Sequence, residues 1–101
     1  MDSIQNHDNK KAIFVCLLNQ KNEIVCTGAA IAQDNENFES VQARCCLNAT
    51  TNFKNLCTLQ LPSFNQKTEQ QVNDVIDALI ALEGYKLHWF YVGYTCQEKQ
   101  Q

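Results

Sequence analysis

Six cysteines are the residues of this chain with the widest choice of chemistry: Cys16, Cys26, Cys45, Cys46, Cys57 and Cys96. Thiols bind zinc, act as nucleophiles, form disulfides or fill a core as small apolar side chains. Zinc is disfavoured because the chain has no CxxC pair and because neighbours on a helix, such as Cys45 and Cys46, point about 100° apart. Five thiols lie inside apolar segments, so we interpret them as reduced core residues, with a zinc site, a catalytic thiol and a disulfide as the alternatives.

Cys57 and His88 form the one candidate pair for nucleophilic catalysis. The sequence predicts that they lie on adjacent strands, and a histidine beside a cysteine is one way to activate a thiol. No oxyanion motif accompanies the pair, and we prefer the alternative of a structural histidine beside a buried thiol. We therefore predict no catalytic residue, no metal site and no cofactor.

The elements that would position these residues are read from hydrophobic pattern and turn signals. The chain is predicted to be a single domain over residues 12–96, with tails at 1–11 and 97–101. The predicted strands are 12–18, 24–31, 56–61 and 86–95, and the predicted helices are 38–53 and 68–83. The second helix has the best local signal, because Thr68 and Gln71 fit a capping box.

The run Ala12–Leu18 is apolar throughout, which predicts a strand that is covered on both faces or lies centrally in the sheet. A three-residue loop over 20–22, with Asn22 in the left-handed region, closes a hairpin to the next strand. This loop pairs Asn19 with Glu23, and the resulting register predicts that Cys16 faces Cys26.

A helix connects the third and fourth predicted strands, so these strands are expected to be parallel neighbours. The prediction is an α+β domain of order β-β-α-β-α-β, with two helices and a mixed four-stranded sheet of order 2-1-3-4. This topology is similar to the core of the ribonuclease H-like fold, minus one strand. Nucleases of that family hold two metal ions with carboxylates from the first strand, the first helix and the next strand. Only Glu39 matches such a position, so the resemblance implies that nuclease chemistry is absent.

The last strand carries the candidate binding residues His88, Trp89, Tyr91 and Tyr94. Alternation places Leu87, Trp89 and Tyr91 on one face, and His88, Phe90, Val92 and Tyr94 on the other. The strand is also a predicted sheet edge, and two helices are few for both faces of a sheet. Exposed edges and aromatic patches become protein interfaces or dimer seams; the alternative is that these aromatics are core.

Charge and composition exclude several classes of function. The net charge is −3, from 8 basic and 11 acidic residues, and Arg44 is the only arginine. The chain thus lacks the basic cluster of a nucleic-acid-binding protein. No apolar run approaches the ~20 residues of a membrane helix, and residues 1–11 lack the apolar region of a secretory signal. These features predict a cytoplasmic protein that binds neither nucleic acid nor membrane.

The function predicted from this profile is non-enzymatic binding of another protein. Short, mildly acidic, motif-free inhibitors and adaptors have this profile, including the anti-defence (anti-CRISPR-like) proteins of phages and mobile elements. A homodimer through the last strand is a further expectation. The alternatives are a small enzyme or degenerate nuclease-like domain using Cys57, His88 or Glu39, and a structural subunit of a larger assembly.

Overall fold

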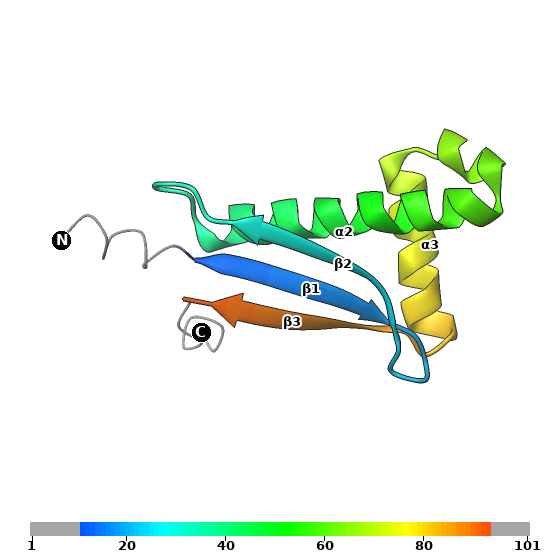
Figure 1. The fold of residues 1–101 in the computed structure, drawn as a ribbon, viewed down its shortest axis with the longest axis horizontal. Helices are drawn as coiled ribbons and strands as arrows, with labels where there is room; N and C mark the ends of the chain where they lie inside the picture. The colour runs from blue at the N-terminus through cyan, green and yellow to red at the C-terminus, as the bar shows by residue number, and fades with distance from the viewer. Residues whose placement is uncertain (1–10, 94–101) are drawn as a thin grey trace.

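The computed structural model describes residues 11–93 of the chain. Its elements are β1 (Ala12–Leu18), β2 (Ile24–Ile31), α2 (Phe38–Gln60), the 3₁₀ helix η1 (Pro62–Gln66), α3 (Glu69–Leu82) and β3 (Lys86–Val92). The three strands form one antiparallel sheet in the order β2-β1-β3. In Figure 1, α2 runs along the sheet beside β2, and α3 crosses the far end of α2 near the β1–β2 turn. The chain is thus an α+β fold, with β1 central as predicted.

The prediction of a four-stranded sheet is wrong, because residues 56–61 form no strand. This segment belongs mainly to α2, which continues to Gln60. Val41, Cys45, Ala49 and Phe53 recur at four-residue steps along the buried side of α2, and Cys57 continues the stripe into the core. A short apolar run such as residues 56–61 is compatible with a strand or a helix, and here the helical period and the packing that it allows favour the helix. Pro62 then begins η1 and ends the helix.

The predicted parallel crossover and the ribonuclease H-like topology are also wrong. Without the third strand, two helices follow one another between β2 and β3, and β3 pairs antiparallel with β1. The observed order is β-β-α-α-β, and the sheet has no parallel pair among the described residues. The predicted tails, 1–11 and 97–101, lie outside the described residues apart from Lys11.

The β1–β2 hairpin has the predicted loop but a different register. Asn22 has a φ of 66°, and the backbone N–H of Asn19 donates to the carbonyl of Glu23 at 2.9 Å. A bulge between Leu17 and Leu18 then shifts the pairing by one residue. A shift of one residue moves every later side chain to the other face. The prediction that Cys16 faces Cys26 is therefore wrong: Cys16 lies opposite Thr27.

The core lies between α2 and one face of the sheet. Ile13, Val15 and Leu17 of β1 are almost fully buried and point towards the helices. The backbones of α2 and β2 approach so closely that a Cβ atom added at Gly28 would lie 2.5 Å from the carbonyl oxygen of Cys45. Gly28 therefore permits the contact between helix and sheet.

Helix α3 confirms the prediction for residues 68–83. Thr68 is its N-cap, and Thr68 and Gln71 form both hydrogen bonds of the capping box. Val72 and Ile76 are buried against Phe53 of α2 and Phe64 of η1 in a second core cluster. Within residues 11–93, no helix has the length and apolar character needed to cross a membrane.

Candidate functional site

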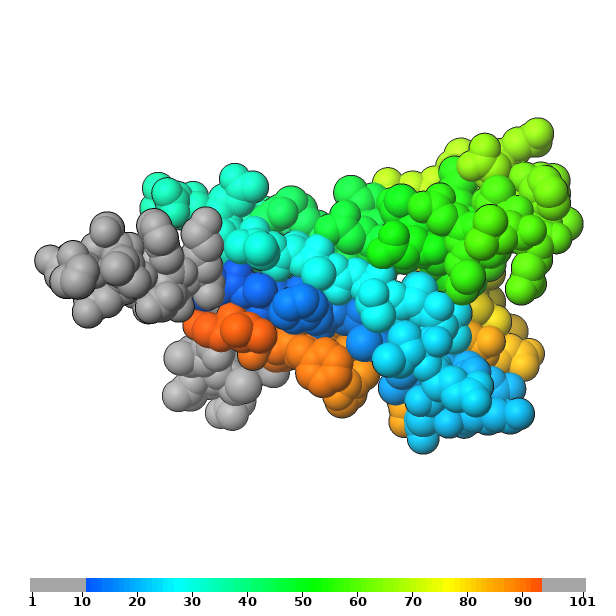
Figure 2. All heavy atoms as spheres, viewed as in Figure 1, coloured from blue at the N-terminus to red at the C-terminus, as the bar shows by residue number. Residues whose placement is uncertain are grey.

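The face of the sheet that points away from α2 is exposed, and we call it the open face. Its side chains follow from strand alternation, because residues opposite one another in the register point to the same side. They are Ala12, Phe14, Cys16 and Leu18 of β1, Ile24, Thr27, Ala29 and Ile31 of β2, and Lys86, His88, Phe90 and Val92 of β3. Figure 2 shows β1, β2 and β3 at the surface along the middle of the molecule.

Large apolar side chains on the open face remain in contact with solvent. Phe14 is 41% exposed, Phe90 46%, Val92 54% and Ile31 57%. Of the two alternatives predicted for β1, the central position is confirmed, whereas the described helices cover only one of its faces. A contiguous exposed apolar patch of this kind is typical of an interaction surface.

An aromatic group lies at the centre of the open face. Phe14 of β1 is flanked by Phe90 of β3 and by Ala29 of β2. The rings of His88 and Phe90 meet edge to face, with centroids 4.6 Å apart and planes at 74°. Along this cross-strand row, the side chains are therefore large on β1 and β3 and small on β2. The row formed by Ala29, Phe14 and Phe90 is entirely apolar. The charged or titratable groups of the open face lie in other rows: Lys86, His88 and the Cys16 thiol.

The outer edge of β2 is capped by side chains of α2. The contacts are Arg44 Nη2 to Ile31 O (2.6 Å), Asn48 Nδ2 to Ala29 O (2.5 Å) and Asn52 Nδ2 to Thr27 O (2.7 Å). Four helical residues advance about 6 Å and two strand residues about 6.6 Å, so the two spacings match. We call Arg44, Asn48 and Asn52 the edge-capping residues, since they occupy the outward carbonyls of an edge strand.

The outer edge of β3 has no such cap in the part of the chain that the structure describes. The N–H of Ala32 donates to the carbonyl of Lys11, so odd-numbered residues of β1 bond to β2 and even-numbered ones to β3. Phe90, which lies opposite Phe14, consequently points its backbone groups inward. The backbone N–H and C=O groups of Leu87 and Trp89 point outward, where no described strand pairs with them.

The four predicted binding residues do not share one surface. His88 lies on the open face, whereas Trp89 and Tyr91 pack against the core on the helix side. The rings of Trp89 and Tyr91 are stacked at 6.3 Å, and Phe38 of α2 lies 5.7 Å from Tyr91. Tyr94 lies outside the described residues. Phe14 and Ile31 also lie on the open face but were not among the predicted residues; strict alternation within the antiparallel sheet is the signal that places them there.

The three candidate catalytic residues lie in separate places. Glu39 is in the first turn of α2 and Cys57 in the last, about 27 Å apart at a rise of about 1.5 Å per residue. Cys57 belongs to the core on the helix side, whereas His88 is on the open face. The thiol opposite His88 is instead that of Cys16. The structure therefore does not bring the predicted Cys57–His88 pair together.

The thiols that the structure describes form no disulfide with one another. Burial raises the pKa of the Cys26 thiol to about 11, with smaller contributions from Cys57 and Cys16. Burial also raises the pKa of Cys45 to about 11, with a further increase from Cys46. A raised pKa reduces the thiolate fraction, which is the form that attacks electrophiles and binds metals. Within residues 11–93, no cluster of three or more His, Cys, Asp or Glu residues could hold a metal ion.

The loop between β2 and α2 is held by one carboxylate. Glu36 accepts hydrogen bonds from Arg44 Nε (2.9 Å) and Nη2 (2.6 Å), from Ser40 Oγ (2.7 Å) and from the backbone N–H of Gln33 (3.0 Å). Hydrogen bonds from Arg44 and then Ser40 lower the pKa of Glu36 to about 2. This network also fixes Arg44 where it caps the carbonyl of Ile31.

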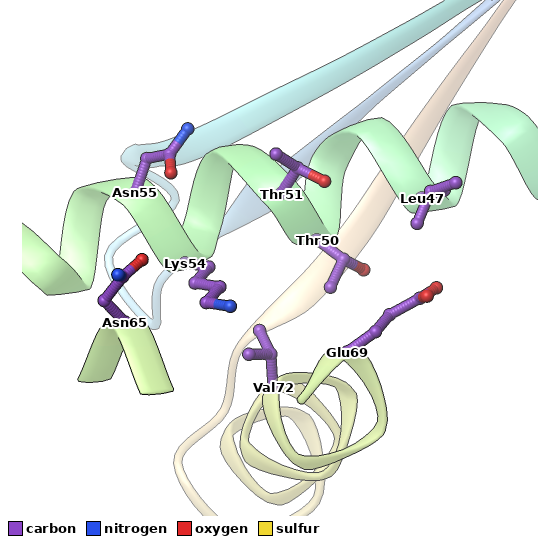
Figure 3. A pocket seen from close by; sticks show the side chains of 8 residues that line it. All are labelled: Leu47, Thr50, Thr51, Lys54, Asn55, Asn65, Glu69 and Val72. Carbon is purple, nitrogen blue, oxygen red and sulfur yellow. The ribbon is translucent and has the colours of Figure 1, made fainter. Parts of the chain in front are cut away.

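A shallow hollow of about 240 Å³ lies between α2, η1 and α3, on a different part of the surface. Figure 3 shows Lys54 and Thr50 of α2 directed towards the gap above α3, with Val72 below them. The buried Thr50 hydroxyl lies 2.7 Å from Asn73 Oδ1 and 2.9 Å from the carbonyl of Cys46, so its bonds are satisfied within the protein. The hollow is smaller than the usual small-molecule site, and we assign it no ligand.

Comparisons with protein-family models, with curated proteins and with solved structures find no match to this chain.

Proposed function

We propose that this protein acts by binding another protein through the open face, as a non-enzymatic inhibitor or adaptor. The exposed apolar row through Phe14 and Phe90 is the observation that carries this proposal. Burying apolar area contributes about 25 cal/mol per Å², so the complex is stabilised when a partner removes these rings from water. Aromatic side chains at the centre of such a surface commonly dominate binding.

The chemistry of the open face favours a protein partner that presents an apolar surface of its own. Lys86 and His88 lie towards one end of β3, so an acidic group on the partner would fit there. The face lacks the row of basic side chains that binds phosphates, which argues against nucleic acid and against an anionic membrane. A cytoplasmic location is part of this proposal, because a reducing compartment keeps unbridged thiols such as those described here free.

The inhibitor and adaptor proteins of phages and mobile elements are the class that this proposal favours. Small size, mild negative charge and an exposed apolar face suit a protein that blocks or recruits a larger one. That assignment rests on the profile of the chain together with the open face.

The test compares open-face variants with a matched control. Tagged wild-type protein, Phe14→Ser, Phe90→Ser and Leu59→Ser are expressed in the cell that naturally carries the gene, and captured proteins are identified by mass spectrometry. Leu59 is a highly exposed leucine of α2, away from the open face. The captured protein is then purified and titrated against each variant.

We expect both open-face variants to lose about tenfold or more in affinity, as for a central aromatic residue of an interface, and Leu59→Ser to bind like wild type. Circular dichroism checks that each variant is folded. Full binding by both open-face variants would contradict the proposal.

A further inference from the structure

We propose that β3 pairs with β3 of a second copy of this chain, antiparallel and about a two-fold axis, to give a six-stranded sheet. This inference concerns the edge of the sheet, whereas the proposed function concerns the open face. The two surfaces adjoin but do not coincide, so a dimer would place two open faces side by side.

The first argument is the difference between the two edges. The outward carbonyls of β2 are occupied by the edge-capping residues, so this edge is a poor template for another strand. Natural proteins protect an edge with Pro, a bulge, a central charge or a covering element. The segment from Leu87 to Val92 has no Pro and no charged residue apart from a titratable histidine, and its pairing with β1 is regular.

The second argument is register. Only residues whose backbone groups point away from β1 can hydrogen-bond across the new edge. Leu87 and Trp89 must therefore lie opposite residues of the second copy whose backbone groups also point outward. A two-fold axis at Trp89 satisfies this condition, because the two Trp89 residues then exchange N–H···O bonds in both directions. The same axis places Lys86 opposite Val92 of the second copy, so no like charges meet.

The third argument is the side chains that this register brings together. On the open face, His88 lies opposite Phe90 of the second copy, and the same two ring types already meet edge to face within one chain. On the helix side, Trp89 is only half-buried, because α2 packs mainly on β2 and β1. The second Trp89 would cover it, and cross-strand aromatic pairs of this kind stabilise sheets.

The surroundings of the β3 edge can be followed in Figure 1. The side of β3 that faces away from β1 carries no described helix or strand in this view. Helix α2 lies on the opposite side of the sheet axis, beside β2, so the two copies of α2 would lie far apart. No described element therefore occupies the place proposed for the second copy; a strand of another protein could pair with the same edge, and the experiment separates these occupants.

The experiment measures association and edge protection on the full chain. Analytical ultracentrifugation over a concentration series gives the mass, with 11.5 kDa expected for one chain and twice that for the dimer. Leu87→Lys places a charge on the β3 edge, and Leu82→Lys makes the same change at an exposed leucine of α3 as the control. Hydrogen exchange by NMR on wild-type protein compares the amides of Trp89 and Ala29, which point outward from β3 and β2 respectively.

We expect a dimer whose association constant falls about tenfold or more in Leu87→Lys, since edge lysines oppose strand pairing, and does not change in Leu82→Lys. The Trp89 amide should exchange slowly in the dimer and quickly after dilution, whereas the Ala29 amide exchanges quickly throughout. The exchange data need no variant, so misfolding of Leu87→Lys leaves the inference falsifiable.

Two results would overturn the inference. The first is a wild-type protein that stays at 11.5 kDa up to ~1 mM with a fast-exchanging Trp89 amide. The second is a dimer that Phe14→Ser dissociates and Leu87→Lys does not, which would assign self-association to the open face. Capture of a partner that depends on Phe14 and Phe90, by a chain that is monomeric, would remove the dimer and leave the proposed function in place.

Discussion

The two edges of the sheet differ in how the chain treats their backbone groups. On β2, side chains at positions 44, 48 and 52 of α2 donate to three outward carbonyls in succession. On β3, the outward groups of Leu87 and Trp89 have no strand beside them in residues 11–93. A helix that packs along one edge strand can cap it with polar side chains every fourth residue, but it cannot reach the opposite edge. The position of α2 thus selects which edge remains available for association.

Gly28 makes the β2 edge accessible to α2, and its replacement should have the largest effect. In Gly28→Ala the new Cβ would lie 2.5 Å from Cys45 O and 2.6 Å from the backbone nitrogen of Ala49. Real Cβ atoms do not approach backbone atoms so closely, so α2 must move away from β2. We expect a loss of about 3 kcal/mol or more in the free energy of unfolding, measured by urea denaturation.

Ala29→Val is the control for this prediction, because it adds methyl groups at the next residue, which is on the open face. The added groups meet solvent, and valine favours strands, so its stability should remain within about 0.5 kcal/mol of wild type. Equal stability of Gly28→Ala and wild type would mean that α2 does not pack on β2 as closely as the structure shows.

Removing two edge-capping residues should make the edges more alike. Asn48→Ala with Asn52→Ala removes the donors to Ala29 O and Thr27 O. Each such hydrogen bond contributes about 1 kcal/mol, so we expect a loss of about 2 kcal/mol in the free energy of unfolding. Because only Arg44 then remains to cap the β2 edge, the variant should also form species larger than a dimer in analytical ultracentrifugation.

Asn55→Ala serves as the control, because Asn55 lies on the same helix and is exposed, yet lies at the hollow rather than at β2. This variant should match wild type in both stability and mass. If the double variant keeps the wild-type mass distribution while losing stability, the capping contacts stabilise the fold without controlling association.

The hairpin and α3 could be predicted from sequence because their signals are local. Asn22 in the left-handed region and the capping box at Thr68 each depend on a few neighbouring residues. The bulge beside Leu18 could not be predicted, since the loop alone does not specify it, and it shifted Cys16 away from Cys26. The extent of α2 was missed because a short apolar run such as residues 56–61, followed by Pro62, is compatible with a strand or a helix until tertiary packing is known.

The candidate site was predicted only in part, for a reason of topology. Recognising an aromatic last strand required composition alone, and this strand lies at an edge of the sheet that residues 11–93 form. Grouping His88 with Phe14 required the antiparallel β1–β3 register, which the misassigned third strand concealed. The edge-capping residues were missed because their four-residue spacing has meaning only once β2 is known to lie beside α2.

The smallest expected effect concerns Arg44, the third edge-capping residue, and is a dependence of stability on pH. Hydrogen bonds from Arg44 and Ser40 hold the pKa of Glu36 at about 2, against 4.5 for a free glutamate. Between these values the unfolded chain binds more protons than the folded one. The stabilisation is therefore fully present above about pH 4.5 and is lost as the pH falls towards 2. Urea midpoints at pH 6 and pH 3 should consequently differ more for wild type than for Glu36→Gln.

Glu39→Gln is the matched control, because it removes an exposed carboxylate from the first turn of the same helix and leaves the Glu36–Arg44 pair intact. Its pH dependence should resemble that of wild type. The comparison also tests the edge: once Glu36 is neutral, Arg44 is held less firmly at Ile31 O, so the β2 edge should become easier to pair at low pH. If Glu36→Gln and wild type show the same acid sensitivity, then the carboxylate does not hold Arg44 in solution, and the β2 edge depends on Asn48 and Asn52 alone.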